Sequence, residues 1–292
     1  MKYYYINLKN SKDRKINMEN FFKKLEVYFE EKINYQRIEA FNGKEENIDD
    51  YIINCKFNNL KSTCFIEDKA SYFNLKLNQN NARVKNLNQG EFGCLYSHIK
   101  AINSFLNTNE DICIICEDDL DDNFFYDPVF FKNKIKYLSG IIDTYGIISL
   151  SCVGNKFLIE KILKSEQKTN NLYKFKKYFF YGTGSYMINR KTAEKIINDF
   201  TIIDNNKLKL KFDNTNQSLV ADNFIYSQAN THFYVPSLFF TKHFNSLTDN
   251  NVNNQYLVQN LMKNNIKYNQ KLKLKTKVNK INSKNQLMFY LK

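Results

Sequence analysis

The segment Ile112–Asp119 reads ICIICEDD, an apolar run that stops abruptly at three adjacent carboxylates. The run predicts a buried strand, and the acidic triplet then lies where that strand meets solvent. Such a strand end suits a divalent cation, because hard ions such as Mg²⁺ and Mn²⁺ take oxygen ligands and bridge carboxylates to substrate phosphates. The alternative for the same residues is a solvated turn, with Asp121 and Asp122 behind it as ordinary solvated charges.

Strand-like and helix-like segments alternate along the rest of the chain. Residues 2–8 (KYYYINL) have the composition of a strand, and apolar residues then recur at helical spacing from Met18 to Tyr28. Residues 51–88 show little periodicity and predict irregular structure. Further patterns predict strands at 35–40, 146–151, 184–189 and 232–240, and helices at 91–106 and 191–200.

This alternation predicts an α/β fold with a mainly parallel central sheet flanked by helices. Ligands of such sheets bind at the carboxyl ends of the strands. We therefore expect the turn at 7–14 and the triplet at 117–119 to face the same crevice.

The net charge of +13 is concentrated at the C-terminus, where residues 250–292 hold nine lysines and no acidic residue. A protein that grips nucleic acid would spread positive charge over its groove, so no nucleic-acid partner is expected. The lysine-rich tail leaves open a peripheral contact with a membrane or another anionic surface, or a solubilising role.

The six cysteines have no spacing typical of a metal site. Cys113 and Cys116 lie three positions apart in a predicted strand, so their side chains point to opposite faces. Free buried thiols in a reducing compartment are expected. No segment reads as a signal peptide or a membrane span, and the sequence predicts a soluble cytoplasmic protein.

Five segments, in their order and separation, resemble glycosyltransferase family 25, which includes lipooligosaccharide and procollagen galactosyltransferases. Members open with an INL-x-x-x-x-x-R type segment and carry a G-E-x-G-C-x-x-S-H helix followed by a strand that ends in E-D-D. The resemblance covers about residues 1–245. The matching segments are YYINLKNSKDR at 4–14, GEFGCLYSH at 90–98, ICEDD at 115–119, YGTGSYMINRKTAEKI at 181–196 and ADNFIY at 221–226.

The resemblance implies a GT-A-type, Rossmann-like fold, a nucleotide-sugar donor, Mn²⁺ or Mg²⁺ as cofactor, and inverting transfer of a hexose. UDP-galactose is the first expectation for the donor and UDP-glucose the second. The acceptor would be a hydroxyl of a glycan, a lipid-linked saccharide or a protein. Residues 1–250 would form the catalytic domain, with a donor half to about 122 and an acceptor half from 123, followed by the basic tail at 251–292.

The resemblance also suggests roles for individual residues. Asp119 and Glu117 are expected to bind the metal. His243 is a further metal candidate, although the family more often has a glutamine-containing segment where this chain has Thr-Lys-His. The expected donor-binding residues are Asn7, Leu8, Arg14, Ser97, Asp118 and the loop of Gly182, Thr183 and Gly184.

The reaction itself suggests further roles. Charge develops on the leaving diphosphate, and Arg14 can make a bidentate phosphate contact. An inverting enzyme also needs a base opposite the leaving group, and Asp222, among apolar neighbours, is the choice. The structural alternative for Asp222 is a helix N-cap. His98 is expected to be a satisfied core histidine.

Two other functions stay open at this point. A nucleotide-sugar-binding homologue could act mainly as a hydrolase or be inactive. A basic nucleic-acid-binding protein is the non-enzymatic alternative. The sugar, acceptor and oligomeric state do not follow from the sequence.

Overall fold

The computed structural model describes residues 1–65, 82–124, 126–154, 159–160, 163, 171–174, 180–212, 218–242, 258–267 and 270. Its centre is a seven-stranded sheet of order β2-β1-β6-β9-β7-β12-β8. The strands are β1 (Lys2–Asn7), β2 (Tyr35–Glu39), β6 (Ile112–Glu117), β7 (Ile147–Gly154), β8 (Leu172–Lys174), β9 (Phe180–Asn189) and β12 (His232–Tyr234).

The sheet is mainly parallel, as predicted. β1 pairs in parallel with β2 and β6, and β12 pairs in parallel with β7. β9 is antiparallel to both of its neighbours, and β8 is antiparallel to β12. Five of the seven strands therefore run in one direction, and the antiparallel β9 pairs with β6 through Ser185 to Asn189.

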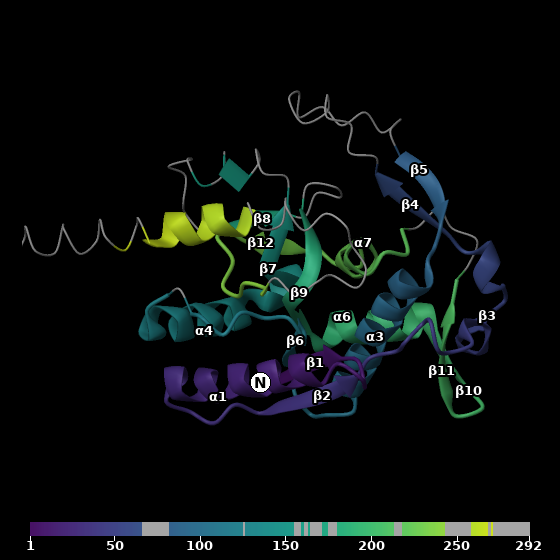
Figure 1. The fold of residues 1–292 in the computed structure, drawn as a ribbon, viewed down its shortest axis with the longest axis horizontal. Helices are drawn as coiled ribbons and strands as arrows, with labels where there is room; N and C mark the ends of the chain where they lie inside the picture. The colour runs from purple at the N-terminus through teal and green to yellow at the C-terminus, as the bar shows by residue number, and fades with distance from the viewer. Residues whose placement is uncertain are drawn as a thin grey trace, which may run out of the picture.

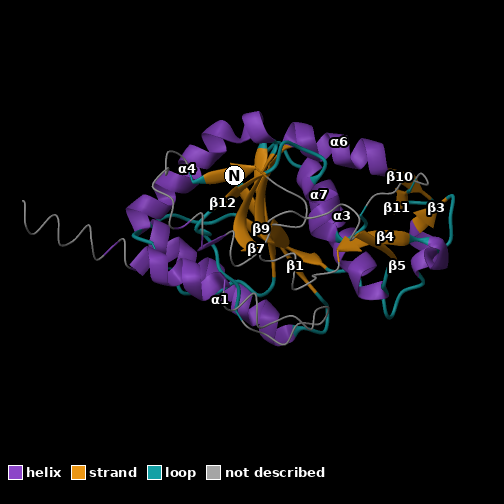
Figure 2. Cartoon of the chain, turned by 90° about the horizontal axis from the view of Figure 1, so that it is seen from above, coloured by secondary structure: helices purple, strands orange, loops and turns teal. Residues whose placement is uncertain are grey.

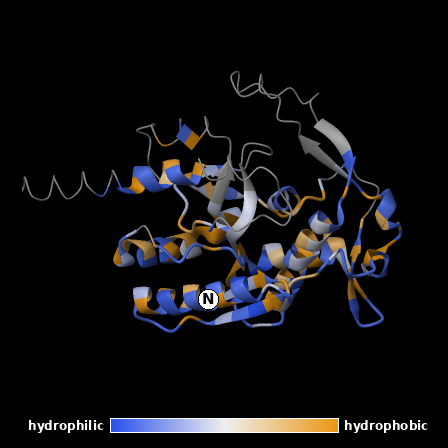
Figure 3. Cartoon of the chain, viewed as in Figure 1, coloured by the Kyte–Doolittle hydropathy of each residue, from blue (hydrophilic) through white to orange (hydrophobic). Residues whose placement is uncertain are grey.

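Helices cover both faces of this sheet (Figures 1 and 2). α1 (Lys12–Phe29) and α4 (Pro128–Tyr145) pack on one face, whereas α3 (Gln89–Leu106), α6 (Arg190–Phe200) and α7 (Ala221–Tyr226) pack on the other. Successive side chains of a strand point to opposite faces of the sheet, so each face has its own hydrophobic core. Tyr3 and Tyr5 of β1 lie in the core beneath α1 and α4, and Tyr4 lies in the core beneath α3, α6 and α7. Polar and apolar residues alternate around α1 and α4 in Figure 3, as expected for helices with one buried face.

The predicted helix at 91–106 begins two residues early, at Gln89, because Asn88 supplies a cap. The Asn88 side chain accepts from the backbone of Glu91, and the Glu91 side chain accepts from the backbone of Asn88. This capping box satisfies two backbone N–H groups that a helix start otherwise leaves unpaired.

The prediction of irregular structure at 51–88 is wrong for the described residues of that segment. After two short 3-10 turns (Ile48–Tyr51 and Phe57–Asn59), β4 (Lys61–Phe65) pairs antiparallel with β5 (Ala82–Asn86). β3 (Ile52–Ile53) joins β10 (Thr201–Asp204) and β11 (Lys207–Lys211) in a three-stranded sheet. β3 pairs with β11, which is distant in sequence, so local periodicity does not predict this strand.

The predicted strand at 232–240 ends at Tyr234, and the cis peptide bond Val235–Pro236 follows it. Beyond it, the backbone N–H groups of Leu238 and Phe239 donate to Leu150 of β7, so this segment still pairs with the sheet.

The lysine-rich tail contributes a helix to the described structure. Residues 258–267 form a helix that buries Val258, Met262 and Ile266, which lie four positions apart on one face. Among the helices of the described residues, none combines the length and the apolarity that crossing a bilayer requires.

Candidate active site

The triplet lies at the carboxyl end of β6, as predicted, and segment 240–242 holds its backbone in place. The carbonyl of Asp119 accepts from the N–H of Lys242 at 2.5 Å, and the N–H of Asp121 donates to the carbonyl of Phe240 at 2.7 Å. Leu120 and Thr241 form an antiparallel bridge between these contacts. His243, the residue after this segment and a predicted metal ligand, lies outside the described residues.

Asp118 joins the ends of β1 and β6, the two strand ends that the sequence predicts to share a crevice. Its Oδ2 accepts from Asn7 Nδ2 at 2.8 Å and its Oδ1 accepts from Arg14 Nη1 at 2.8 Å. Burial raises the pKa of Asp118, with Glu117 adding to it, and these effects outweigh the two donors. Asn7 in turn accepts from Arg37 Nε of β2 at 2.9 Å, so these hydrogen bonds connect β6, β1 and β2.

Asp119, the last member of the triplet, differs from Asp118. Its Oδ1 is buried and has no hydrogen-bond partner among the described residues. Burial, together with the charges of Glu117 and Asp118, raises the pKa of Asp119 to about 8. A carboxylate with an unpaired buried oxygen near two other carboxylates is stabilised by a cation.

Glu117 points toward α3 and β9. Its Oε1 accepts from Thr183 Oγ1 and lies 3.5 Å from His98 Nε2. Burial acts to raise the pKa of Glu117, but His98, Thr183 and Arg14 outweigh it and lower the pKa. Glu117 is therefore held as a carboxylate, in contrast to Asp119.

Asp222 lies in the first turn of α7, facing β9. Its Oδ2 accepts from the N–H of Gly182 at 3.0 Å, and its Oδ1 accepts from the N–H of Asn223 at 2.6 Å. The N-cap of α7 is Val220, so Asp222 is not the N-cap that the structural alternative proposes. Burial raises the pKa of Asp222, and the nearby charge of Glu117 adds to the rise, against the two N–H donors.

Gly182, Thr183 and Gly184 lie inside β9 and not in a loop, which corrects that part of the expectation. Gly182 has φ +91°, a value that favours glycine, and its carbonyl accepts from Tyr226 Oη at 2.9 Å. Consecutive residues of β9 therefore hold the two carboxylates, Gly182 binding Asp222 and Thr183 binding Glu117. At Gly184 a Cβ atom would lie 3.0 Å from Ser151 Oγ, so a larger residue would disturb the approach of β7.

Other predicted residues lie nearby but contact the protein itself. Ser97 is buried; it donates to the carbonyl of Gly93 at 2.6 Å and accepts from the N–H of Phe41 at 2.8 Å. The carbonyl of Leu8 accepts from Arg37 Nη2 at 3.3 Å. Ser97 thus fixes α3 to the segment after β2, and the side chain of Leu8 has no polar role.

The prediction that Asp121 and Asp122 are ordinary solvated charges is wrong. Asp121 is 9% exposed and pairs with Lys263 of the C-terminal helix at 3.0 Å. Asp122 pairs with Lys242 at 2.7 Å and also with Lys24. Both carboxylates anchor distant segments beside the triplet.

The prediction for Cys113 and Cys116 is confirmed, because both are free and buried, one in each core. Cys94 was missed. It is half-buried on α3, one turn before His98, and its Sγ lies within 4.8 Å of both His98 and Glu117. The spacing of four between a cysteine and a histidine on one helix was the available signal.

Comparison with known families identifies the family of the chain. The model of glycosyltransferase family 25, described as an LPS biosynthesis protein, matches residues 1–215. The chain belongs to glycosyltransferase family 25. The match takes in β1, α3, the triplet and β9, whereas Asp222 lies beyond its end. No curated protein matches the chain.

As a family 25 member the chain is a glycosyltransferase, and the family implies a sugar donor and a glycan acceptor in general terms. Its mixed α/β sheet is compatible with the Rossmann-like fold expected of such an enzyme. Membership favours an enzyme over the basic nucleic-acid-binding alternative.

Proposed function

We propose that this family 25 glycosyltransferase is metal-dependent and inverting, and that it transfers a hexose from a UDP-sugar to a hydroxyl. One observation carries the proposal. Asp119, whose buried Oδ1 has no partner among the described residues, lies just after β6, and the last residue of β6, Glu117, accepts from β9, as does Asp222. A cation-binding carboxylate and a separate basic carboxylate are what an inverting transfer needs.

The residues present fit a hard divalent cation such as Mn²⁺ or Mg²⁺. Asp119 would hold it, because its Oδ1 is buried without a partner among the described residues. When bound, such a cation supplies Lewis-acid stabilisation of the negative charge on the leaving UDP. Glu117 is the less suitable ligand for this hard cation, because its carboxylate is directed toward Thr183 and His98.

The end of β1 would receive the donor diphosphate. Arg14 lies at the start of α1, where Asp118 fixes its guanidinium at 2.8 Å, so its positive charge stays beside the triplet. Asn7 is oriented from both sides, by Asp118 and by Arg37. Pre-positioned groups of this kind stabilise charge that develops in the transition state without having to reorganise.

Asp222 would take the proton of the acceptor hydroxyl. Its raised pKa strengthens it as a base, and the N–H groups of Gly182 and Asn223 fix its orientation. Each carboxylate oxygen has more than one lone pair, so Asp222 can still accept from a substrate hydroxyl.

Galactose is our first choice of sugar and glucose the second. The family description, LPS biosynthesis, supports a lipid-linked saccharide as the first acceptor to test. A peripheral contact of the lysine-rich tail with an anionic surface would suit such an acceptor.

A donor screen tests the proposal. The full-length protein is incubated with UDP-galactose, UDP-glucose and GDP-mannose, each with and without Mn²⁺, and release of UDP or GDP is measured. Mn²⁺-dependent release from a UDP-hexose, increased by a saccharide acceptor, is expected. Release that no acceptor increases would instead support a hydrolase, and equal release with a chelator present would contradict metal dependence.

A further inference from the structure

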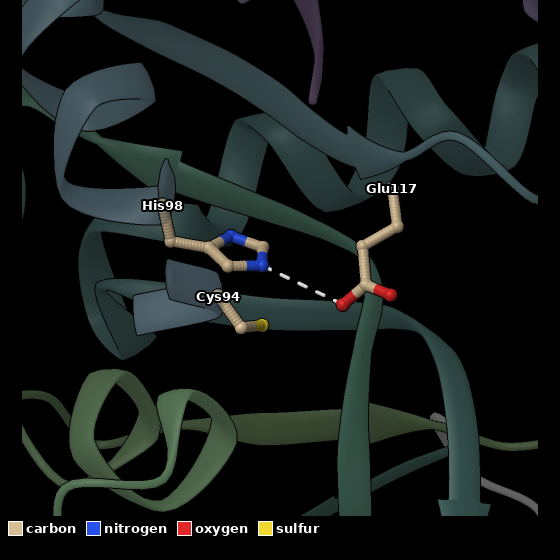
Figure 4. A group of neighbouring side chains, drawn as sticks. All are labelled: Cys94, His98 and Glu117. Atoms are coloured by element: carbon tan, nitrogen blue, oxygen red, sulfur yellow. Dashed lines mark ion pairs between the residues drawn. The ribbon is translucent and has the colours of Figure 1, made fainter. Parts of the chain in front are cut away.

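Behind the triplet, α3 and the end of β6 bring together three side chains of a different chemical kind. Cys94 and His98 lie one turn apart on α3 and point toward Glu117 (Figure 4). Cys94 Sγ, one ring nitrogen of His98 and one carboxylate oxygen of Glu117 all lie within 4.8 Å of one another. Sulfur, imidazole and carboxylate are the usual zinc ligands.

His98 supplies a second, independent observation. Its side chain is 1% exposed, and its Nε2 has no hydrogen-bond partner among the described residues. That atom points at Glu117 Oε1 across 3.5 Å, beyond the usual range of about 2.7–3.2 Å for an N–H···O bond. A buried nitrogen lone pair and a carboxylate oxygen that face each other at this distance are stabilised by a cation between them.

The distance fits a shared cation. Zn²⁺ binds nitrogen and oxygen at about 2.0–2.2 Å, so two ligands of a tetrahedral site lie about 3.3–3.6 Å apart. The observed separation of His98 Nε2 and Glu117 Oε1 is 3.5 Å. The sulfur of Cys94 lies within 4.8 Å of one ring nitrogen of His98 and of one carboxylate oxygen of Glu117, at most about 1.2 Å beyond the tetrahedral sulfur-to-ligand spacing of about 3.6 Å.

The other ring nitrogen of His98 is also placed for this role. Nδ1 lies 3.1 Å from the hydroxyl of the buried Tyr186 on β9. A histidine that donates from Nδ1 keeps a lone pair on Nε2, which is the form that binds a metal.

We propose that Cys94, His98 and Glu117 form a binding site for Zn²⁺ or a similarly thiophilic cation, separate from the hard-cation site at Asp119. The thiolate and imidazole ligands select against Mg²⁺ and Mn²⁺, whereas the oxygen of Asp119 favours them. The thiol proton of Cys94 leaves to solvent on binding, and the fourth position is open to water. The bound cation links α3 to β6 and fixes Glu117 beside Thr183.

Titration with Co²⁺ alone tests this site without any substrate. The full-length protein is stripped of metal, and Co²⁺ is added while the thiolate-to-cobalt charge-transfer absorption is recorded. We expect an absorption that saturates at one Co²⁺ per chain and disappears when Zn²⁺ is added. Cys94→Ser should abolish it and His98→Asn should weaken Co²⁺ binding at least tenfold. Cys55→Ser, which removes another half-buried thiol, should leave it unchanged.

A wild-type protein without this absorption, or a folded Cys94→Ser protein that keeps it, would overturn the proposal in favour of a direct contact between His98 and Glu117. Should Cys94→Ser fail to fold, X-ray absorption at the zinc edge of the wild-type protein decides, since the site requires one sulfur ligand. Asp119→Asn separates this proposal from the proposed function. It should keep the cobalt–thiolate absorption while losing Mn²⁺-dependent UDP binding.

Discussion

Arg14 Nη1 donates to Asp118 Oδ1 at 2.8 Å and joins α1 to the residue after β6, 104 positions later. The side chains are 18% and 11% exposed, so solvent screens the pair only weakly. Yet burial and Glu117 raise the pKa of Asp118 despite its two donors. The buried carboxylate of Asp118 therefore lowers the stability of the fold, and the charge of Arg14 offsets part of this loss.

This relationship predicts an asymmetry between two substitutions. Arg14→Ala leaves Asp118 buried beside Glu117 without its cationic partner and should cost about 3–5 kcal/mol, as for other pairs broken on one side. Asp118→Asn removes the charge while keeping the shape, and should cost less than about 1 kcal/mol. Urea unfolding at pH 7 measures both. A larger loss for Asp118→Asn than for Arg14→Ala would contradict this account.

Much of the central sheet could be predicted from the sequence, because its strands carry local signals. The apolar run of β6 and the aromatic run of β1 each predict a strand. Because the carboxyl ends of neighbouring parallel strands meet at one edge of the sheet, Asn7 and Asp118 are expected to lie close together. What the sequence does not reveal is pairing between distant segments. The two residues of β3 form a strand only because β11 lies beside them.

The same limit applies to the site. Asp121 and Asp122 read as solvated charges because their partners are remote in sequence, Lys263 being 142 positions from Asp121. The position of Gly182 and Thr183 within β9 also depends on tertiary contacts, since Asp222 and Glu117 reach them from other elements. Apart from the pairing of Asn7 with Asp118, the partners of these side chains were not readable from the sequence.

Asp122 predicts a pH-dependent contribution to stability. Burial acts to raise its pKa, but Lys24 and Lys242 outweigh it and lower the pKa from 3.8 to about 2. A lowered pKa in the folded state means that the contribution is present above pH 4 and is lost as the pH falls through 2. Because solvent screens the exposed ammonium of Lys24, we expect Asp122 to contribute about 1–2 kcal/mol to the free energy of unfolding at neutral pH.

Unfolding of wild type and Asp122→Asn in urea, at pH 7 and at successively lower pH, measures this contribution. The difference in unfolding free energy between the two proteins should shrink as the pH falls below 4. A difference that stays constant down to pH 2 would show that Asp122 acts through something other than its charge.

The C-terminal helix at 258–267 is predicted to stabilise the catalytic fold. Met262 is fully buried, its sulfur accepts from Ser237 Oγ at 3.7 Å, and Lys263 of the next position pairs with Asp121. Met262→Ala should therefore cost about 2–4 kcal/mol by creating a cavity. Asn264→Ala, at an exposed position of the same helix, is the matched control and should change stability by less than about 0.5 kcal/mol. Thermal melts that do not separate the two variants would place this helix outside the cooperative unit.

Asp222 gives the sharpest prediction for catalysis. Asp222→Asn keeps the shape of the side chain, and its amide oxygen can still accept from the N–H of Gly182, now 3.0 Å from Oδ2. It cannot take a proton, so the rate of sugar transfer should fall by about 10²–10⁴. Binding of UDP with Mn²⁺, measured by calorimetry, should stay within about twofold of wild type, because the proposed donor contacts come from the ends of β1 and β6 and the start of α1. Asp199→Asn, an exposed carboxylate on α6, serves as the control for loss of one charge. Full transfer activity in Asp222→Asn would remove Asp222 as the base, whereas loss of UDP binding together with transfer would assign it to the donor site.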